Sequence, residues 1–255
     1  MAAIHDLSVR SLCCEIRSNG KKIGSATSFI AKRNNTHFLV TNRHVVTGLH
    51  ADKGTPLSGN GAVPDEILVW HNAKERLAMW RDIIYPLKDK DGKPTWLEYP
   101  KRDAQIDVVV LPISIRDNIT FYPYDLNGAD ELDIDVRIGS ELFVIGFPFG
   151  KAVDGKFPIW IRASLATEPV LNWEGQPRFL VDARTRQGQS GSPAVVVNTT
   201  GHYVDSNGNV VLGKLGDWKL LGIYSGRINS QSDLGIVWKR DLLEELLSNG
   251  VSPES

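Results

Sequence analysis

The 255-residue chain contains only two cysteines, Cys13 and Cys14, and they are adjacent. A disulfide between neighbouring cysteines would strain the peptide that joins them, so we expect free thiols packed in a first strand. The first eight residues have no basic segment followed by an apolar run, and no apolar stretch is long enough for a transmembrane helix. Together these absences predict a protein of the reducing cytoplasm.

The charges of the chain nearly cancel, and several site motifs are missing. A net charge of −1 gives no overall field to attract nucleic acid or an anionic membrane, so neither is expected as a partner. There is no His-Glu-x-x-His for zinc and no Gly-Lys-Ser/Thr loop for phosphate. A Gly-x-Ser-x-Gly elbow is missing too, because Ser192 stands where its second glycine is needed. The sequence therefore predicts neither a metal nor a cofactor.

Short apolar runs follow one another along most of the chain, as in barrels and sandwiches. The predicted strands are 12–17, 26–31, 37–41, 66–70, 77–85, 95–99, 108–113, 142–145, 159–164, 178–183, 194–198, 220–224 and 234–238. Two-residue hairpin turns are expected at Asn19-Gly20, Asp91-Gly92 and Asn207-Gly208. One clear helix covers 240–247, with leucines on one face and Asn249-Gly250 at its end.

These strands divide into two barrels, an N-terminal one over residues 1–115 and a C-terminal one over residues 135–255. The polar stretch 116–134 is the predicted linker between them. A site that uses residues of both barrels would lie in the cleft where they meet.

Ser190 lies between glycines on a predicted turn, directly before an apolar strand. A serine hydroxyl is a poor nucleophile unless a base takes its proton. His44 follows an apolar strand and Asp107 opens another, so both partners are present; Asp103 is a second possible carboxylate. Singly, each motif also fits an ordinary turn or strand end, but their combination in this order favours a catalytic triad.

The glycines around Ser190 have expected roles of their own. Gly188 can adopt a backbone conformation that turns its N–H and that of Ser190 toward one point, which would form an oxyanion hole. Gly191 and the small Ser192 are expected to leave room for a peptide backbone, and Pro193 to end the turn.

The order His, Asp, Ser and the segment Gly-Gln-Ser-Gly-Ser-Pro resemble the trypsin-like serine peptidases, although Gln189 and Ser192 depart from the family pattern. The bacterial stress-protease branch is the most similar, without its PDZ domain. The supporting segments are Gly24–Ile30, Gly146–Gly150, Gly222–Gly226 and Gly235–Val237. Because Gln189 carries no charge, activation by an inserted N-terminal ammonium is not expected.

The resemblance implies a chymotrypsin-like fold of two six-stranded antiparallel barrels with a C-terminal helix docked on the second. It implies an endopeptidase in which His44, Asp107 and Ser190 cleave a peptide bond through an acyl-enzyme. A protein or peptide substrate would bind in the inter-barrel cleft along Ser225 and Gly226, with the Ser225 hydroxyl supporting Asp107. The alternative is a catalytically silent barrel that binds peptides or acts as a scaffold.

The resemblance also implies where the residue before the scissile bond, P1, would bind. Arg184 would lie at the bottom of that pocket, Arg227 near its entrance and Gly235 on its far wall. Two guanidinium groups would repel basic side chains, so an acidic or small polar P1 residue is expected.

Overall fold

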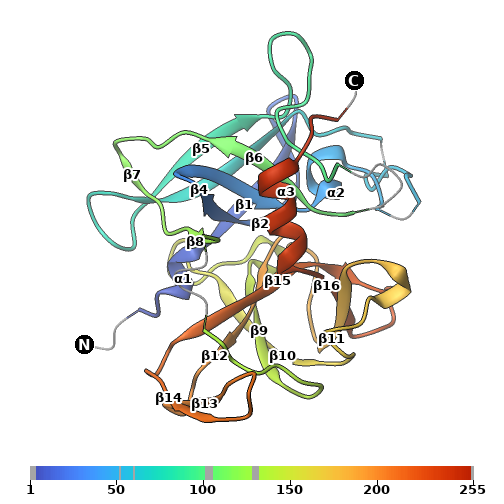
Figure 1. Ribbon diagram of the computed structural model, residues 1–255. Coiled ribbons are helices and arrows are strands. Elements are labelled where there is room, and N and C mark those ends of the chain that lie inside the picture. Colours follow the sequence, from blue (N-terminus) through green and yellow to red (C-terminus); the bar gives the residue numbers. More distant parts are fainter. Residues whose placement is uncertain (1–3, 52, 60, 101–105, 128–131, 254–255) are drawn as a thin grey trace.

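The computed structural model describes residues 4–51, 53–59, 61–100, 106–127 and 132–253, and it is mostly β (Figure 1). A twisted sheet from the N-terminal half lies against a barrel from the C-terminal half, and helix α3 runs between them. The strands are β1 Ser11–Ser18, β2 Lys21–Arg33, β3 Thr36–Thr41, β4 Glu66–Ala73, β5 Trp80–Pro86, β6 Val109–Ile113, β7 Ile119–Thr120, β8 Tyr124–Asp125, β9 Glu141–Gly146, β10 Ile159–Leu165, β11 Arg178–Ala183, β12 Pro193–Val197, β13 His202–Val204, β14 Val210–Leu212, β15 Trp218–Arg227 and β16 Leu234–Lys239. The helices are α1 Leu7–Arg10, α2 Arg43–Thr47 and α3 Arg240–Asn249, with 3₁₀ turns η1 Pro148–Gly150 and η2 Trp173–Gly175.

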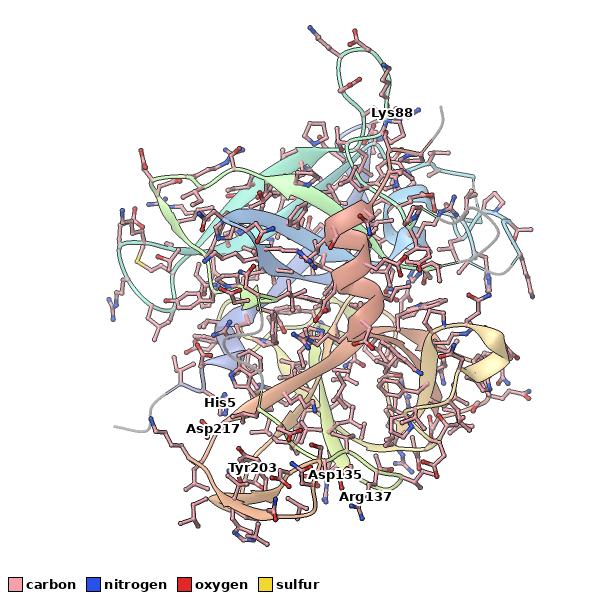
Figure 2. The ribbon with its side chains drawn as sticks, in the orientation of Figure 1. His5, Lys88, Asp135, Arg137, Tyr203 and Asp217 are labelled. Atoms are coloured by element: carbon pink, nitrogen blue, oxygen red, sulfur yellow. The ribbon has the colours of Figure 1, made fainter. Side chains whose placement is uncertain are left out.

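The C-terminal half forms a closed barrel of six antiparallel strands in the order β10-β11-β16-β15-β12-β9. Strands β13 and β14 make a separate two-stranded hairpin that projects from it. Figure 2 shows Tyr203 of this hairpin at the end of the molecule opposite Lys88, which lies in a loop of the N-terminal half. The predicted closed C-terminal barrel is confirmed.

The N-terminal half is a half-barrel and not the second closed six-stranded barrel that we expected. Its main path is β5-β4-β1-β2-β3-β6, and the end strands β5 and β6 do not pair with each other. The predicted strand 95–99 does not close the gap, because it contributes only isolated bridges, Leu97 to Val110 and Glu98 to Val251. Two short strands in the predicted linker join this sheet: β7 pairs with β4, and β8 runs parallel to β2.

One hydrophobic core joins the two halves. Phe29 and Val110 of the half-barrel share it with Ile223 and Trp238 of the closed barrel and with the buried leucines of α3. Helix α3 was expected to dock on the second barrel, but it packs against both, and Arg33 of β2 donates a 3.0 Å hydrogen bond to the carbonyl of Glu244. The core therefore fixes the two halves against each other and shapes the groove between them.

Only one of the three predicted hairpin turns has the expected geometry. Asn19 and Gly20 both have positive φ, 50° and 71°, as a two-residue primed turn requires. The other two are three-residue loops in which the glycine alone is left-handed. Each is closed by an aspartate whose role was not predicted, Asp89 or Asp205, and its carboxylate accepts two backbone N–H groups.

Cys13 and Cys14 are free and buried in β1, as predicted.

Candidate active site

His44 lies on a single turn of helix that follows β3 directly. The expected position was a strand end; instead α2 begins at Arg43, after the extended Asn42, and is capped at its C-terminus by Gly48 with φ of 69°. The buried side-chain amide of Asn42 donates a 2.6 Å hydrogen bond to the carbonyl of Asp107. Asn42 thereby ties the helix that carries His44 to the segment just before β6.

Asp107 holds His44 by two hydrogen bonds, one to the ring and one to the backbone. Its Oδ2 lies 2.7 Å from Nδ1 of His44, and its Oδ1 accepts the backbone N–H of His44 at 2.9 Å. With Nδ1–H directed at the carboxylate, the neutral ring keeps the lone pair of Nε2 available to accept a proton. Asp103, the alternative carboxylate, lies outside the described residues.

The environment of His44 shifts its pKa in two opposing ways. Burial lowers the pKa of His44, whereas the charge of Asp107 and the hydrogen bond to it raise that pKa. The influence of Asp107 outweighs burial, so the pKa of His44 lies above its ordinary value. The ring is therefore a stronger base than a free imidazole.

Ser225 connects the nucleophile to the carboxylate. It lies at a bulge in β15, between Tyr224 and Gly226, which pair with Val237 and Ile236 of β16. The Ser225 hydroxyl donates a hydrogen bond to Oδ2 of Asp107. Its carbonyl accepts the hydroxyl of Ser190 at 2.9 Å. In this arrangement the proton of Ser190 points at the carbonyl of Ser225 and not at His44.

The turn that carries Ser190 packs on the 3₁₀ turn η1. Gly188 has φ of 96°, and a Cβ there would collide with the carbonyl of Phe147. The N–H of Phe149 donates a 2.5 Å hydrogen bond to the carbonyl of Gln187. The segment of η1 was noted in the sequence only for its resemblance to a family turn, but here it supports the residues next to the predicted oxyanion hole. Among the described backbone groups, none accepts the N–H of Gly188 or of Ser190.

Thr27 of β2 holds this turn against the half-barrel, and sequence reasoning missed it. The side chain is fully buried, and its hydroxyl donates to the carbonyl of Gly188 at 2.9 Å and accepts the N–H of Phe147 at 3.1 Å. The backbone N–H of Thr27 donates to the carbonyl of Ser190 at 2.8 Å. One residue of the first half therefore fixes both turns of the second half that surround the site.

Gly191 and Ser192, which we expected to leave room for a peptide backbone, have close packing partners inside the protein. A Cβ at Gly191 would collide with the carbonyl of Thr27, so this glycine allows β2 to approach the turn. Ser192 is buried against Gly146, where the absence of a side chain makes space for its hydroxyl. Gly191 therefore serves the packing between the halves, and Ser192 the packing within the closed barrel.

Gln189 is fully buried and stabilises the turn from within. Its Oε1 accepts the N–H of Arg186 at 2.8 Å, and its own N–H donates to the carbonyl of Arg186 at 3.2 Å. The neutral amide thus has a local backbone partner.

The residues of the predicted P1 pocket lie around a hydroxyl pair that the sequence did not suggest. The hydroxyl of Tyr224 forms a hydrogen bond with the buried Thr185, and the Tyr224 ring packs directly on Gly235. Arg184 is 86% exposed and its guanidinium lies 3.9 Å from Asp233. Arg227 is only partly exposed and its guanidinium is 3.4 Å from the carbonyl of Ser232.

Two cavities meet at the candidate triad. One of about 190 Å³ is bounded by His44 and Asp107 and by residues 225–227 of β15. The other, of about 530 Å³, is bounded by the turn that carries Ser190 and by His44 and further residues of the half-barrel. The structure therefore brings the predicted catalytic residues together in a cleft between the two halves.

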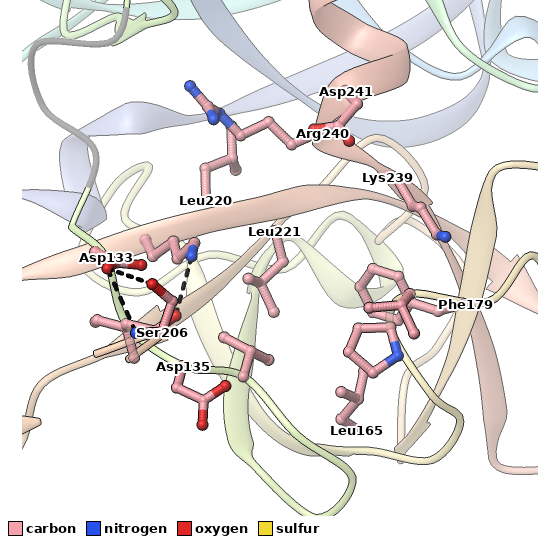
Figure 3. A pocket seen from close by; sticks show the side chains of 15 residues that line it. Asp133, Asp135, Leu165, Phe179, Ser206, Leu220, Leu221, Lys239, Arg240 and Asp241 are labelled. Atoms are coloured by element: carbon pink, nitrogen blue, oxygen red, sulfur yellow. Dashed lines mark hydrogen bonds between the residues drawn. The ribbon is translucent and has the colours of Figure 1, made fainter. Parts of the chain in front are cut away.

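A cavity of about 330 Å³ on the closed barrel is separate from these residues (Figure 3). Phe179 and Leu221 line it together with Lys239 and Asp241, and Ser206 donates a 2.7 Å hydrogen bond to Asp133 at its edge. Charges of both signs line it, which favours no particular ligand.

Within the described part of the chain, no three His, Cys, Asp or Glu side chains are grouped so that they could hold a metal ion. No helix in the same residues has the length and apolarity needed to cross a membrane.

A half-barrel and a closed barrel with a histidine, an aspartate and a serine turn between them define the trypsin-like fold. Residues 26–204 match the family model of the trypsin-like peptidase domain, which is well over half of the chain. The protein therefore belongs to the trypsin-like peptidase family.

Solved structures show the same fold at low sequence identity. The active form of the Rv3671c protease from M. tuberculosis is 15% identical with a TM-score of 0.52, and the match covers 98% of this chain and 85% of that one. The serine endoprotease from Yersinia pestis is 14% identical with a TM-score of 0.54, over 97% of this chain. The match spans 66% of the Yersinia protein. No curated protein sequence matches the chain.

Proposed function

We propose that the protein is a serine endopeptidase that uses Ser190 as nucleophile, His44 as general base and acid, and Asp107 as the group that orients His44. The observation that carries this proposal is the double hydrogen bond of Asp107 to the ring and backbone of His44, 2.7 and 2.9 Å, beside the Ser190 turn. A barrel that only binds peptides has no need of a carboxylate that fixes an imidazole tautomer.

The chemistry follows from these contacts. His44 takes the proton of Ser190 as its oxygen attacks a peptide carbonyl, and Asp107 stabilises the imidazolium. The N–H groups of Gly188 and Ser190 bind the oxyanion. His44 then gives the proton to the leaving amine, and water releases the acyl group by the same steps in reverse order.

Substrate binding helps to start the reaction. A peptide that adds as a strand along the exposed edge at Ser225 presents its own N–H to the carbonyl that now accepts the Ser190 hydroxyl. That N–H competes for the carbonyl and frees the Ser190 proton to turn toward His44.

The P1 pocket is proposed to accept an acidic or small polar side chain. Arg227 borders the cavity on the β15 side of the triad, and the paired hydroxyls of Thr185 and Tyr224 lie nearby. A guanidinium group binds a carboxylate with charge-assisted hydrogen bonds and repels an ammonium group.

A fluorophosphonate probe tests the proposed activity directly, because it labels a serine only when a base activates it. The expected result is one label on Ser190 and cleavage of a denatured protein substrate, both lost in Ser190→Ala. Binding of peptides without labelling or cleavage would favour the catalytically silent alternative.

A further inference from the structure

The cavity of about 530 Å³ lies beside the catalytic residues, and its lining combines apolar side chains with uncharged polar ones and His44. The described residues that line it are Ile16, Ile23, Gly24, Ser25, His44, Val45, Gly48, Leu57, Ser58, Gly59, Ala62, Pro64, Gln187, Gly188 and Ser190. No Asp, Glu, Lys or Arg is among them. Its volume falls in the range of sites that enclose a ligand or a large side chain.

Two of its apolar residues are left in contact with solvent. Leu57 is 52% exposed and Ile23 is 38% exposed, and they border the same cavity. The partly buried Ile16 and the buried Val45 and Pro64 line the cavity beside them. Apolar side chains grouped in a concave site gain free energy when a partner covers them, at about 25 cal/mol per Å².

The position of the cavity tells which part of a substrate reaches it. Under the proposed function, the residues before the scissile bond pair with β15 at residues 225–227, which border the smaller cavity. The larger cavity shares His44 and Leu57 with the smaller one, but Gly188 and Ser190 line it in place of Asp107 and residues 225–227. A peptide that places its carbonyl at Ser190 must therefore direct the residues after the scissile bond into the larger cavity.

The wall of the cavity is attached to the helix that carries His44. The N–H of Gly48 donates to the carbonyl of His44 at 2.9 Å, and the N–H of Leu57 donates to the carbonyl of Gly48 at 2.8 Å. Gly48 also contacts Pro64 so closely that a Cβ would lie 2.6 Å from its ring. Leu57 is therefore held in a fixed place relative to the catalytic base.

We propose that this cavity selects substrates with a large aliphatic or aromatic side chain on the C-terminal side of the scissile bond, and that Ile23 and Leu57 determine this specificity. The inference rests on the proposed serine endopeptidase function. It concerns the leaving-group side of the site, and neither Arg184 nor Arg227 lines the cavity there.

Acyl transfer isolates this side of the site. An acyl-enzyme formed from p-nitrophenyl acetate has already lost its leaving group, so an added amine must bind in the leaving-group position to react. The amine nitrogen attacks the acyl carbonyl and the bond to Ser190 Oγ breaks. His44 takes the amine proton and returns it to Ser190. The ratio of amide to acetate formed then measures how well each amine binds.

The amides of leucine, phenylalanine, glycine, aspartate and lysine would be compared as acceptors. We expect leucine and phenylalanine amides to give amide product about tenfold or more over glycine amide, with aspartate amide no better than glycine. In Leu57→Asp and Ile23→Asp this preference should fall severalfold, and the yield of amide product from lysine amide should rise. Leu212→Asp is the matched control, because Leu212 is 88% exposed on β14, far from the cleft (Figure 1).

Fluorophosphonate labelling of the same samples distinguishes a failure of the proposed specificity from a failure of the proposed endopeptidase function. If Ser190 is labelled but all amines react alike, or if Leu57→Asp behaves like Leu212→Asp, the cavity does not select the leaving group. If Ser190 is not labelled in the unmodified protein, the proposed endopeptidase function is wrong, and the proposed specificity is then wrong as well.

Discussion

The hydroxyl of Ser190 donates a 2.9 Å hydrogen bond to the carbonyl of Ser225. The Ser225 hydroxyl in turn donates to Asp107, which orients His44. One residue of β15 therefore contacts both ends of the proposed triad. Because the same edge is where a peptide would pair, the state of the nucleophile and the binding of substrate are linked through Ser225.

The first prediction concerns the nucleophile and its base. Ser190→Ala and His44→Ala should each lower peptide cleavage by about 10⁴-fold or more, and the double variant should be little worse than either one, since the residues act as a unit. Steady-state cleavage and fluorophosphonate labelling measure this, with circular dichroism as a check on folding. Normal labelling of His44→Ala would rule out the proposed base.

The second prediction concerns the carboxylate. Asp107→Asn should fold but lower turnover by about 10⁴-fold, because the amide favours the wrong tautomer of His44. Asp103→Asn is the matched control and should change turnover little. The reverse pattern would show that Asp103 is the orienting carboxylate.

The third prediction is the pH dependence of cleavage. His44 must be neutral to accept a proton, and its pKa lies above the ordinary 6.5, so kcat/KM should rise with pH along a limb centred above 6.5. In Asp107→Asn burial remains while the charge of the carboxylate is lost, so the residual activity should titrate at lower pH. The pH profile of kcat/KM for both proteins tests this, and an unshifted limb would contradict the role of Asp107.

The raised pKa of His44 also affects stability. Protonation of His44 is favoured more in the folded than in the unfolded protein, so this stabilisation is complete below the unfolded pKa near 6.5. It is lost as pH rises through the higher folded pKa. The free energy of unfolding in urea should therefore depend on pH in the same way in the unmodified protein and in Ser190→Ala, which keeps the contacts of His44 with Asp107. Asp107→Asn should lack this pH dependence.

Thr27 leads to the fourth prediction. Thr27→Val keeps the shape of the side chain but removes the hydroxyl that links Gly188 to Phe147, so the oxyanion turn should be displaced. We expect kcat to fall by about 10²-fold with a small change in KM, and the free energy of unfolding to fall by about 1–3 kcal/mol. Thr27→Ser keeps the hydroxyl and should restore most of kcat. A loss of stability with unchanged kcat would show that Thr27 only supports the fold.

Most of the strands and the three candidate triad residues could be proposed from the sequence, because each leaves a local pattern. Periodic apolar runs mark strands, and the glycine-flanked Ser190 marks a turn. Thr27 leaves no such pattern, since its hydrogen bond to Gly188 joins residues 161 positions apart. The same holds for Asn42, whose partner Asp107 lies 65 positions away.

The parts that were predicted wrongly depend on the same long-range contacts. Whether the first sheet closes is decided by the pairing of β5 and β6, which no local run determines. The packing of Thr27 against Gly191 was likewise not predicted, because no local pattern in the sequence indicates it. The larger cavity is likewise assembled from β1, β2, α2 with the loop after it, and the serine turn.

The last prediction concerns the residue before the scissile bond. Arg227 borders the cavity beside Ser225, whereas Arg184 is 86% exposed and faces Asp233. A peptide library should show acidic or small polar P1 residues preferred over basic ones, since the guanidinium attracts a carboxylate and repels an ammonium. Arg227→Ala should shift the profile toward apolar P1 residues, and Arg184→Ala, made in parallel, measures how far the more exposed arginine contributes. A profile dominated by lysine and arginine at P1 would show that neither side chain contacts the substrate.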